Sequence, residues 1–385
     1  MKKNKSSFIS FKYKILLMYE RLVRTYESRQ VVLSGMAFFL GILWDIFTIG
    51  RMDQRSNIVQ LGTYTLLTMA LVLLELLEEK HEGIQMALAQ ARQRRFVGTI
   101  VSYRIELTHF LLGSLLSAFT IFFVKSASLW SSVAFIFLIG AALVVNELPI
   151  LRRKGVQIRL CFAVVCMASY LCCLLPLVLK SIGPIPFSLA LFLTFLIFGT
   201  SLVCLGKAFH ISQKLYERDF PILLGTLGAF GIFYMCGWIP PVPLALTKIG
   251  IYRDVQRSGD IYELRHRRSP WQFWQKGEQT FDARQGDRIF VFFSVFAPSG
   301  FHENLKVKWY YYDQEKGRDL RDTMEVSMIG GRDAGYRGFA YKSRYQNGEW
   351  QVTIETADER EIGRLNLTVR QGAGDQLRPM LLDFY

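Results

Sequence analysis

Charged residues are scarce in this chain. Only 20% of its 385 residues are Asp, Glu, Lys or Arg, while 51% are hydrophobic. A typical soluble domain carries about 25% charged residues and has no long apolar runs. The imbalance argues against an ordinary soluble enzyme and favours a chain with membrane-spanning segments.

Residues that carry common active-site chemistry are also sparse. The chain has five histidines, and no Cys or His spacing in it is typical of a zinc site. It lacks the serine-hydrolase elbow, the phosphate-binding loop and the metalloprotease helix signature. We therefore expect no catalytic residue, cofactor or metal, and the sequence leans toward a protein that is not an enzyme.

Cysteine is missing from the C-terminal part of the chain. All six cysteines lie between Cys161 and Cys236, inside the apolar region. If residues after 246 are exported to an oxidising compartment, they must fold there without disulfides.

Long apolar runs are abundant. A helix needs about 20 apolar residues to cross roughly 30 Å of hydrocarbon, and seven windows reach this length. They cover residues 30–49, 58–78, 107–126, 128–146, 159–180, 184–206 and 220–239. Pro221 is expected in the first turn of the last span.

Three prolines follow the seventh span, at positions 240, 241 and 243. Proline removes a backbone donor and fixes φ, so we expect these residues to end the helix at the membrane interface. Trp238, just before them, suits the aromatic belt of that interface. A kinked helix or a re-entrant segment is the alternative.

The predicted organisation has five parts. A basic amphipathic segment, 1–29, precedes a membrane domain, 30–246. A linker, 247–258, leads to a β domain, 259–372, and a tail, 373–385.

Positive charge is distributed unequally between the connections. Twenty Lys and Arg lie in the N-terminal segment and after spans two, four and six, against four in the other connections. Cytoplasmic loops retain positive charge, so we expect a cytoplasmic N-terminus and, after seven spans, an exported C-terminal domain. This predicts a multi-pass membrane protein whose C-terminal domain lies in the periplasm or outside the cell if the chain is bacterial, in which case the membrane is the inner membrane. The net charge of +14 then faces anionic lipids, which disfavours a nucleic-acid partner.

A few acidic residues lie within or near the predicted spans. Asp45 is the deepest, and four more follow near the end of span two: Glu75, Glu78, Glu79 and Glu82. Charge at bilayer depth is costly and is usually kept for function, so these acids could line a cavity. The alternative places the glutamates at the interface, paired with arginines of the next loop. Those arginines are Arg92, Arg94 and Arg95.

The C-terminal part alternates between apolar and polar residues and is interrupted by turn sequences. Strands are expected near 259–265, 279–282, 288–296, 304–313, 322–329, 336–345, 349–356 and 362–370. Short strands at this spacing favour an antiparallel, immunoglobulin-like sandwich. The fold class is therefore a membrane bundle of about seven helices followed by an all-β domain.

Alternation also predicts which side chains face the core of the sandwich. The inward set is Leu305, Val307, Trp309, Tyr311, Trp350, Val352 and Ile354, whereas Gln351, Thr353 and Glu355 point outward.

Basic and aromatic residues recur among the side chains expected to face outward. One strand provides Lys306, Lys308, Tyr310 and Tyr312, and another provides Tyr336, Lys342 and Arg344. If the two strands share a sheet, these residues form a surface suited to an anionic glycan or headgroup. The alternative is a solvated face, or one that docks on the bundle.

Residues 240–370 resemble a known family. The run "PPVPLALTKIGIY", the strands "FFSVFAPSG" and "KVKWYYY", and the ending "GYRGFAYKSRYQNGEWQVTIETADEREIGRLNLTV" are similar to bacterial multi-spanning proteins ending in domain of unknown function 2914. The resemblance implies a membrane protein with an exported β domain and implies no reaction.

Two functions remain open. The first is a non-enzymatic envelope protein whose bundle anchors a β module that binds a glycan, a lipid headgroup or a periplasmic partner protein. The second is a membrane-embedded transporter or enzyme with the β domain as a lid or docking module. Membrane lipids are partners in both, and the oligomeric state is left open.

Overall fold

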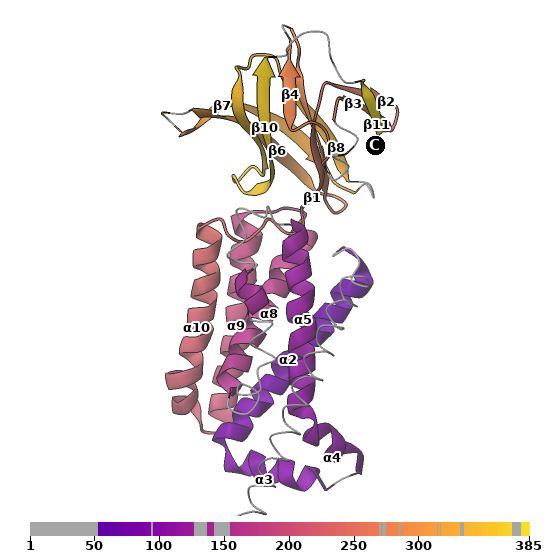
Figure 1. Ribbon diagram of the computed structural model, residues 1–385. Helices are drawn as coiled ribbons and strands as arrows, with labels where there is room; N and C mark the ends of the chain where they lie inside the picture. Colours follow the sequence, from indigo (N-terminus) through magenta and orange to yellow (C-terminus); the bar gives the residue numbers. More distant parts are fainter. Residues whose placement is uncertain are drawn as a thin grey trace, which may run out of the picture.

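The chain forms a helical bundle with a β domain at one end (Figure 1). This computed structural model describes residues 53–93, 95–126, 137–141, 155–268, 271, 275–284, 286–313, 315, 317–331, 335–371 and 379–385. The predicted segment 1–29, the predicted span 30–49 with Asp45, and most of the predicted span 128–146 lie outside these residues.

Seven helices of the bundle have bounds that fall among the described residues. Their bounds are α2 Arg55–Lys80, α3 Glu82–Ala91, α4 Arg95–Ser102, α5 Arg104–Ser126, α8 Val156–Leu179, α9 Pro184–Ala208 and α10 Ser212–Met235. Of the described helices, α2, α5, α8 and α9 are long and apolar enough to cross a membrane. These four agree with four predicted spans, so the described residues support a membrane bundle and leave the total of seven spans as a proposal.

Helix α8 lies at the centre of the bundle and packs against α2, α5, α9 and α10. Its position explains why two thirds of its apolar window is buried inside the protein. Cys166, Cys172 and Cys173 belong to this packed interior. These three cysteines of α8 are therefore small core residues.

Helix α10 ends before the three prolines. Gly237 has φ +72°, and the amide of Trp238 donates to Phe233 O at 2.9 Å. Gly237 N also donates to Tyr234 O at 3.0 Å, and Trp238 stacks on Phe233 with ring centroids 5.4 Å apart. This is a glycine-terminated Schellman motif. The glycine ends the helix, and the prolines keep the chain from resuming it.

Only nine residues, 236–244, separate the end of α10 from the first strand of the β domain. Its strands are β1 Ala245–Tyr252, β2 Asp254–Ser258, β3 Ile261–His266, β4 Thr280–Ala283, β5 Ile289–Phe296, β6 His302–Asp313, β7 Gly317–Ile329, β8 Tyr336–Lys342, β9 Gly348–Glu355, β10 Glu361–Gln371 and β11 Leu381–Phe384. Eight of them match the predicted strands. The predicted linker 247–258 is wrong, because these residues form β1 and β2, and part of the predicted tail forms β11.

Two sheets face each other around the core. One has the order β4-β10-β9-β6-β7 and the other β1-β5-β8. Pairing is antiparallel except between β4 and β10, which run parallel. The core between the sheets contains Val291, Phe293, Leu305, Val307, Trp309, Val352 and Ile354. The inward predictions for β6 and β9 are thus confirmed, with Tyr311 partly buried against the same core.

The outward face of β9 differs from the prediction. Gln351, Thr353 and Glu355 are all buried, although they point away from the core. β9 is the middle strand of the five-stranded sheet, so side chains from both neighbouring strands cover it. Gln351 donates to Asn366 of β10 at 2.8 Å, and Lys308 of β6 pairs with Glu355 at 2.7 Å.

A third sheet, β11-β3-β2, covers part of the outer face of β1-β5-β8. The contact is apolar and aromatic, and Tyr252, Tyr262, Leu264 and Phe292 are buried in it. Because β11 pairs with β3, the segment 381–384 is an integral part of the domain.

Candidate functional site

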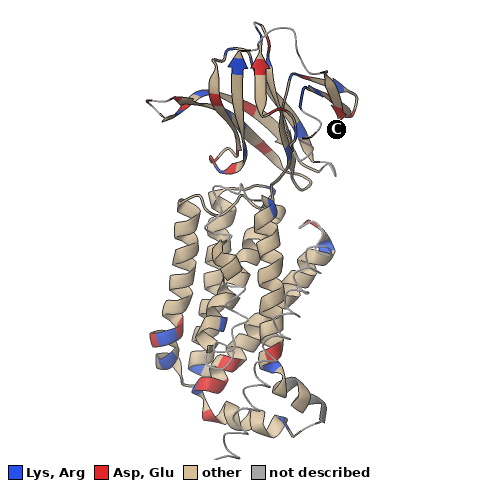
Figure 2. Ribbon diagram, in the orientation of Figure 1, with Lys and Arg blue, Asp and Glu red and all other residues tan. Residues whose placement is uncertain are grey.

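Most charged residues of the described helices lie at the end of the bundle away from the β domain (Figure 2). Glu75 in α2 is 5% exposed there. Its carboxylate accepts a hydrogen bond of 2.6 Å from Arg159 Nε and one of 3.0 Å from Thr108 Oγ1. A buried charge is tolerated when it is paired and hydrogen-bonded, so this group ties α2 to α5 and α8.

The neighbouring glutamates are also paired. Glu78 forms an ion pair with Arg104, and Glu79 with Arg218 at 3.2 Å. Arg104 and Arg218 lie in α5 and α10, so the acids bind helices of the bundle. These contacts differ from the predicted pairing with loop arginines, of which Arg94 and the side chain of Arg95 lie outside the described residues. Glu82 is not on their face, because α2 ends at Lys80 and Glu82 begins α3.

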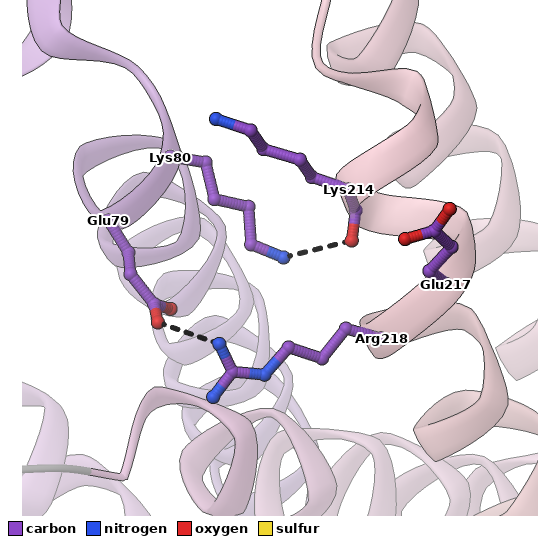
Figure 3. Close-up of a pocket in the computed structure, with 5 residues that line it drawn as sticks. All are labelled: Glu79, Lys80, Lys214, Glu217 and Arg218. Atoms are coloured by element: carbon purple, nitrogen blue, oxygen red, sulfur yellow. Dashed lines mark hydrogen bonds and ion pairs between the residues drawn. The ribbon is translucent and has the colours of Figure 1, made fainter.

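A cavity of about 310 Å³ lies between the end of α2 and the start of α10. It is lined by Glu79, Lys80, Lys214, Glu217 and Arg218. Figure 3 shows Lys80 reaching toward the carbonyl of Lys214, and Arg218 reaching toward Glu79 from the opposite helix.

The charges around this cavity largely neutralise one another. Lys80 also forms an ion pair with Asp219, which is fully buried. Among the described residues, no group of three or more His, Cys, Asp or Glu side chains is placed to hold a metal ion. The cavity therefore has the features of a helix junction fastened by ion pairs.

The opposite end of the bundle holds the β domain. Arg360, in the turn between β9 and β10, donates to Tyr234 O at 3.0 Å and to Ile239 O at 3.1 Å. Its guanidinium carbon lies 3.4 Å from the centroid of the Tyr234 ring, and Asp358 accepts from Arg360 Nε at 3.0 Å. This one side chain joins the turn to the end of α10 and the segment after it.

A second contact crosses the same junction. The amide of Ile182, between α8 and α9, donates to Glu303 Oε1 of β6 at 3.1 Å. Burial raises the pKa of Glu303, the Ile182 hydrogen bond lowers it in part, and nearby Asp358 raises it. The two contacts hold the domain at separate points of the bundle.

The predicted basic and aromatic surface does not form as one face. β6 and β8 belong to different sheets, so Lys306, Lys308, Tyr310 and Tyr312 are separated from the residues of β8. The prediction required the two strands to share a sheet. Which strands pair is decided by long-range contacts, and the local sequence pattern does not encode them.

The lysines of β6 interact with residues of their own domain. Lys308 Nζ lies 2.7 Å from Glu355 and 3.5 Å from Glu359. Burial lowers the pKa of Lys308, but the hydrogen bond and charge of Glu355 outweigh it, so the pKa is raised overall. Lys306 donates to Ala357 O at 3.1 Å. Tyr310 lies under Arg318 at 3.7 Å, which leaves Tyr312 as the exposed ring of this set.

The residues predicted on β8 have the opposite orientation. Lys342 is 7% exposed, pairs with Asp322 at 3.0 Å and lies 5.6 Å from the Trp350 ring. Tyr336 packs partly buried against the core, and Arg344 is exposed beyond the end of the strand. The outward set of β8 is therefore Arg337, Phe339 and Tyr341.

Sequence analysis missed Arg360. Its segment, "TADER", reads as an ordinary polar turn. A usable signal is topological: β1 enters the domain from the bundle and Ala245 pairs with Phe296, so the turn after β5 must also lie near the bundle. Placing the β9–β10 turn there requires knowledge of the sheet order.

Residues 302–369 match the family described as "Protein of unknown function (DUF2914)". This agrees with the resemblance of the C-terminal part and covers β6 to most of β10. No curated protein matches the chain.

Several solved structures resemble part of the chain. An immunoglobulin-like protein from Pseudomonas aeruginosa is 14% identical, with a TM-score of 0.19, over 30% of this chain and 97% of that one. A beta-glucosidase from Listeria innocua is 10% identical, with a TM-score of 0.20, over 36% of this chain and 18% of that one. A beta-glucosidase from Kluyveromyces marxianus is 11% identical, with a TM-score of 0.18, over 38% and 16%.

Proposed function

We propose that this chain is a bacterial inner-membrane protein without enzymatic activity, whose bundle anchors an exported β module and holds it in a fixed orientation. The module binds a glycan, a lipid headgroup or a partner protein of the envelope. The observation that carries the proposal is the Arg360 contact, which fastens the β9–β10 turn to the end of α10. A tethered module that only needed to stay near the membrane would not require it.

The Glu303 contact supports the same proposal. It engages the α8–α9 connection, whereas Arg360 engages α10 and the segment after it. Two attachment points on different connections resist both tilting and rotation of the domain. With β1 beginning at Ala245, little free chain separates the two parts.

The orientation we propose follows from the charges. The twenty-to-four excess of Lys and Arg favours a cytoplasmic N-terminus. The end of the bundle away from the β domain carries most of the charged residues of the described helices (Figure 2). This distribution supports a cytoplasmic charged end and a periplasmic or extracellular β domain.

A membrane-embedded transporter or enzyme is the second candidate. It is favoured by one observation, the buried Glu75–Arg159 pair between α2 and α8. A transport pathway usually needs polar groups along the whole depth of a bundle. The charged pairs described here gather at one end, which favours the anchoring function.

Reporter fusions test the orientation. A reporter active only outside the cytoplasm should be active when fused after Asp254 and inactive when fused after Arg95. A cytoplasmic reporter at the same two positions should give the reverse pattern. Activity of the exported reporter after Arg95 but not after Asp254 would refute the proposal.

A further inference from the structure

The outer face of the β1-β5-β8 sheet is rich in aromatic residues. Phe290 lies opposite Tyr341, and Phe292 lies opposite Phe339. Directly opposed residues of an antiparallel pair share a face, and the alternate residues Val291 and Phe293 belong to the core. These four rings therefore point away from the interior of the sandwich.

The third sheet covers only part of this aromatic face. Phe292 is fully buried beneath it. Phe339 and Tyr341 remain 38% and 46% exposed, and Phe290 is half-buried between them. The Phe290 ring centroid lies 5.6 Å from that of Tyr341 and 6.3 Å from that of Phe339. We call Phe290, Phe339 and Tyr341 the aromatic strip.

Two arginines lie at one end of the aromatic strip. The guanidinium of Arg288 is 5.1 Å from the Tyr341 ring. Arg344 is exposed just after β8, in a segment held beside this end because Tyr345 Oη donates to Asp287 O at 2.9 Å. Among the described residues, neither arginine has a carboxylate within ion-pair distance.

The nearest acidic residue in sequence is already engaged. The Asp287 carboxylate accepts from Arg253 at 3.4 Å and from the amide of Arg284 at 3.1 Å. Among the residues that the structure describes, no carboxylate therefore balances the positive charge of Arg288 and Arg344. Lys306, Lys308 and Lys342, by contrast, all have partners in their own domain.

We propose that the aromatic strip, with Arg288 and Arg344, binds an acidic polysaccharide. Aromatic rings provide flat apolar platforms for the C–H faces of sugars. Arginine donates paired hydrogen bonds to a carboxylate or phosphate, and its charge complements an anionic chain. A small ligand generally occupies a concave pocket, whereas side chains arrayed across two strands suit an extended polymer. This inference rests on the proposed function and names the ligand class.

The test uses the full chain in nanodiscs of phosphatidylcholine. Polygalacturonate is titrated as the acidic polysaccharide and dextran as the neutral one, with binding followed by biolayer interferometry. We expect saturable binding of polygalacturonate that weakens with added salt, and little binding of dextran. Phe339→Ala, Tyr341→Ala and Arg288→Glu should each weaken binding by about tenfold, the effect of losing roughly 1.4 kcal/mol.

Matched controls lie on the other sheet. Tyr312→Ala removes an exposed ring, and Arg318→Glu makes the same charge change, both away from the aromatic strip. These controls should leave binding unchanged. An unchanged melting temperature shows that each variant is folded, and Tyr341→Phe, which keeps the ring, serves as the second variant at that position.

Three results would overturn the inference. The first is that polygalacturonate does not bind. The second is that strip and control variants change binding equally. The third is that strip variants still bind polygalacturonate but no longer bind added nanodiscs of phosphatidylglycerol. The last result would identify a lipid surface as the occupant. Both faces of a nanodisc are accessible to the polysaccharide, so the titration does not depend on how the chain is oriented in the membrane. A negative titration therefore leaves the anchoring proposal intact. Inverted reporter fusions would refute that proposal without affecting the titration.

Discussion

Removing the Arg360 side chain should loosen the β domain from the bundle. Arg360→Ala deletes two charge-assisted hydrogen bonds, to Tyr234 O and Ile239 O, and a cation–π contact with the Tyr234 ring. Hydrogen bonds to charged groups contribute about 1.5–3 kcal/mol each, and a cation–π contact about 0.5–2 kcal/mol. Water can replace part of these interactions at an interface, so we expect Arg360→Ala to weaken the junction by about 2–4 kcal/mol.

Hydrogen exchange measures this loss. The amide of Ile182 donates to Glu303 across the junction, so it reports separation of the two parts. Exchange follows the local opening equilibrium, and about 2–4 kcal/mol corresponds to roughly a 30- to 700-fold increase in opening. The measurement uses the full chain in nanodiscs.

Arg364→Ala is the control for this experiment. Arg364 pairs with Glu361 inside the β domain, through Nε and Oε1 at 2.7 Å. Its removal should leave the Ile182 amide protected. The reasoning is refuted if Arg360→Ala leaves exchange at Ile182 unchanged, or if Arg364→Ala accelerates it equally.

Three further predictions concern the β domain. A fragment beginning at Leu244 should show a β-type circular dichroism spectrum and melt identically with and without reductant. A fragment beginning at Asp254 lacks β1 and should be largely unfolded. Equal melting of the two fragments would contradict this prediction. In the longer fragment, Trp309→Ala should lower the free energy of unfolding in urea by about 3–5 kcal/mol, because Trp309 is fully buried. A decrease below about 1 kcal/mol would instead show a loosely packed core. The pKa of Lys308 is raised, so its pair with Glu355 stabilises the fold fully below the unfolded pKa of about 10.4 and loses this effect as the pH rises through the folded pKa. Lys308→Met should therefore destabilise at pH 8 by about 1–3 kcal/mol, and by progressively less as the pH is raised above about 10.4. An effect that stays constant with pH would exclude the ion pair as the cause.

Local pattern predicts the strands well and their surroundings poorly. The alternation "LKVKWYYY" identifies β6 and its buried face, because every second residue is strongly apolar. The pattern of β8, "YRGFAYK", has apolar residues on both faces. The core side of β8 includes Gly338, where an added Cβ would come within 2.8 Å of the Phe293 ring. Phe293 is the residue opposite Gly338 on the neighbouring strand β5. A small residue that makes room for a large one on the next strand cannot be recognised from one strand alone.

The charged end of the bundle was predicted in part. Spacing placed Glu75, Glu78 and Glu79 near one another, but their partners come from three different helices, α8, α5 and α10. Pro221, expected in a first turn, lies inside α10 because that helix begins at Ser212. The polar residues of its first turns obscured the start. The partners of the glutamates depend on helix packing, which sequence spacing does not reveal.

The pairing of β11 with β3 has a consequence for biosynthesis. β3 is made early, yet seven strands separate it from β11 along the chain. Contacts between distant segments form slowly because the loop between them must first be closed. Until residues 381–385 reach the growing domain, Tyr385 cannot cover Phe292, whose ring it contacts at 5.4 Å. A chain that lacks β11 would therefore keep part of an apolar face open to chaperones and proteases, which links quality control of this domain to synthesis of β11.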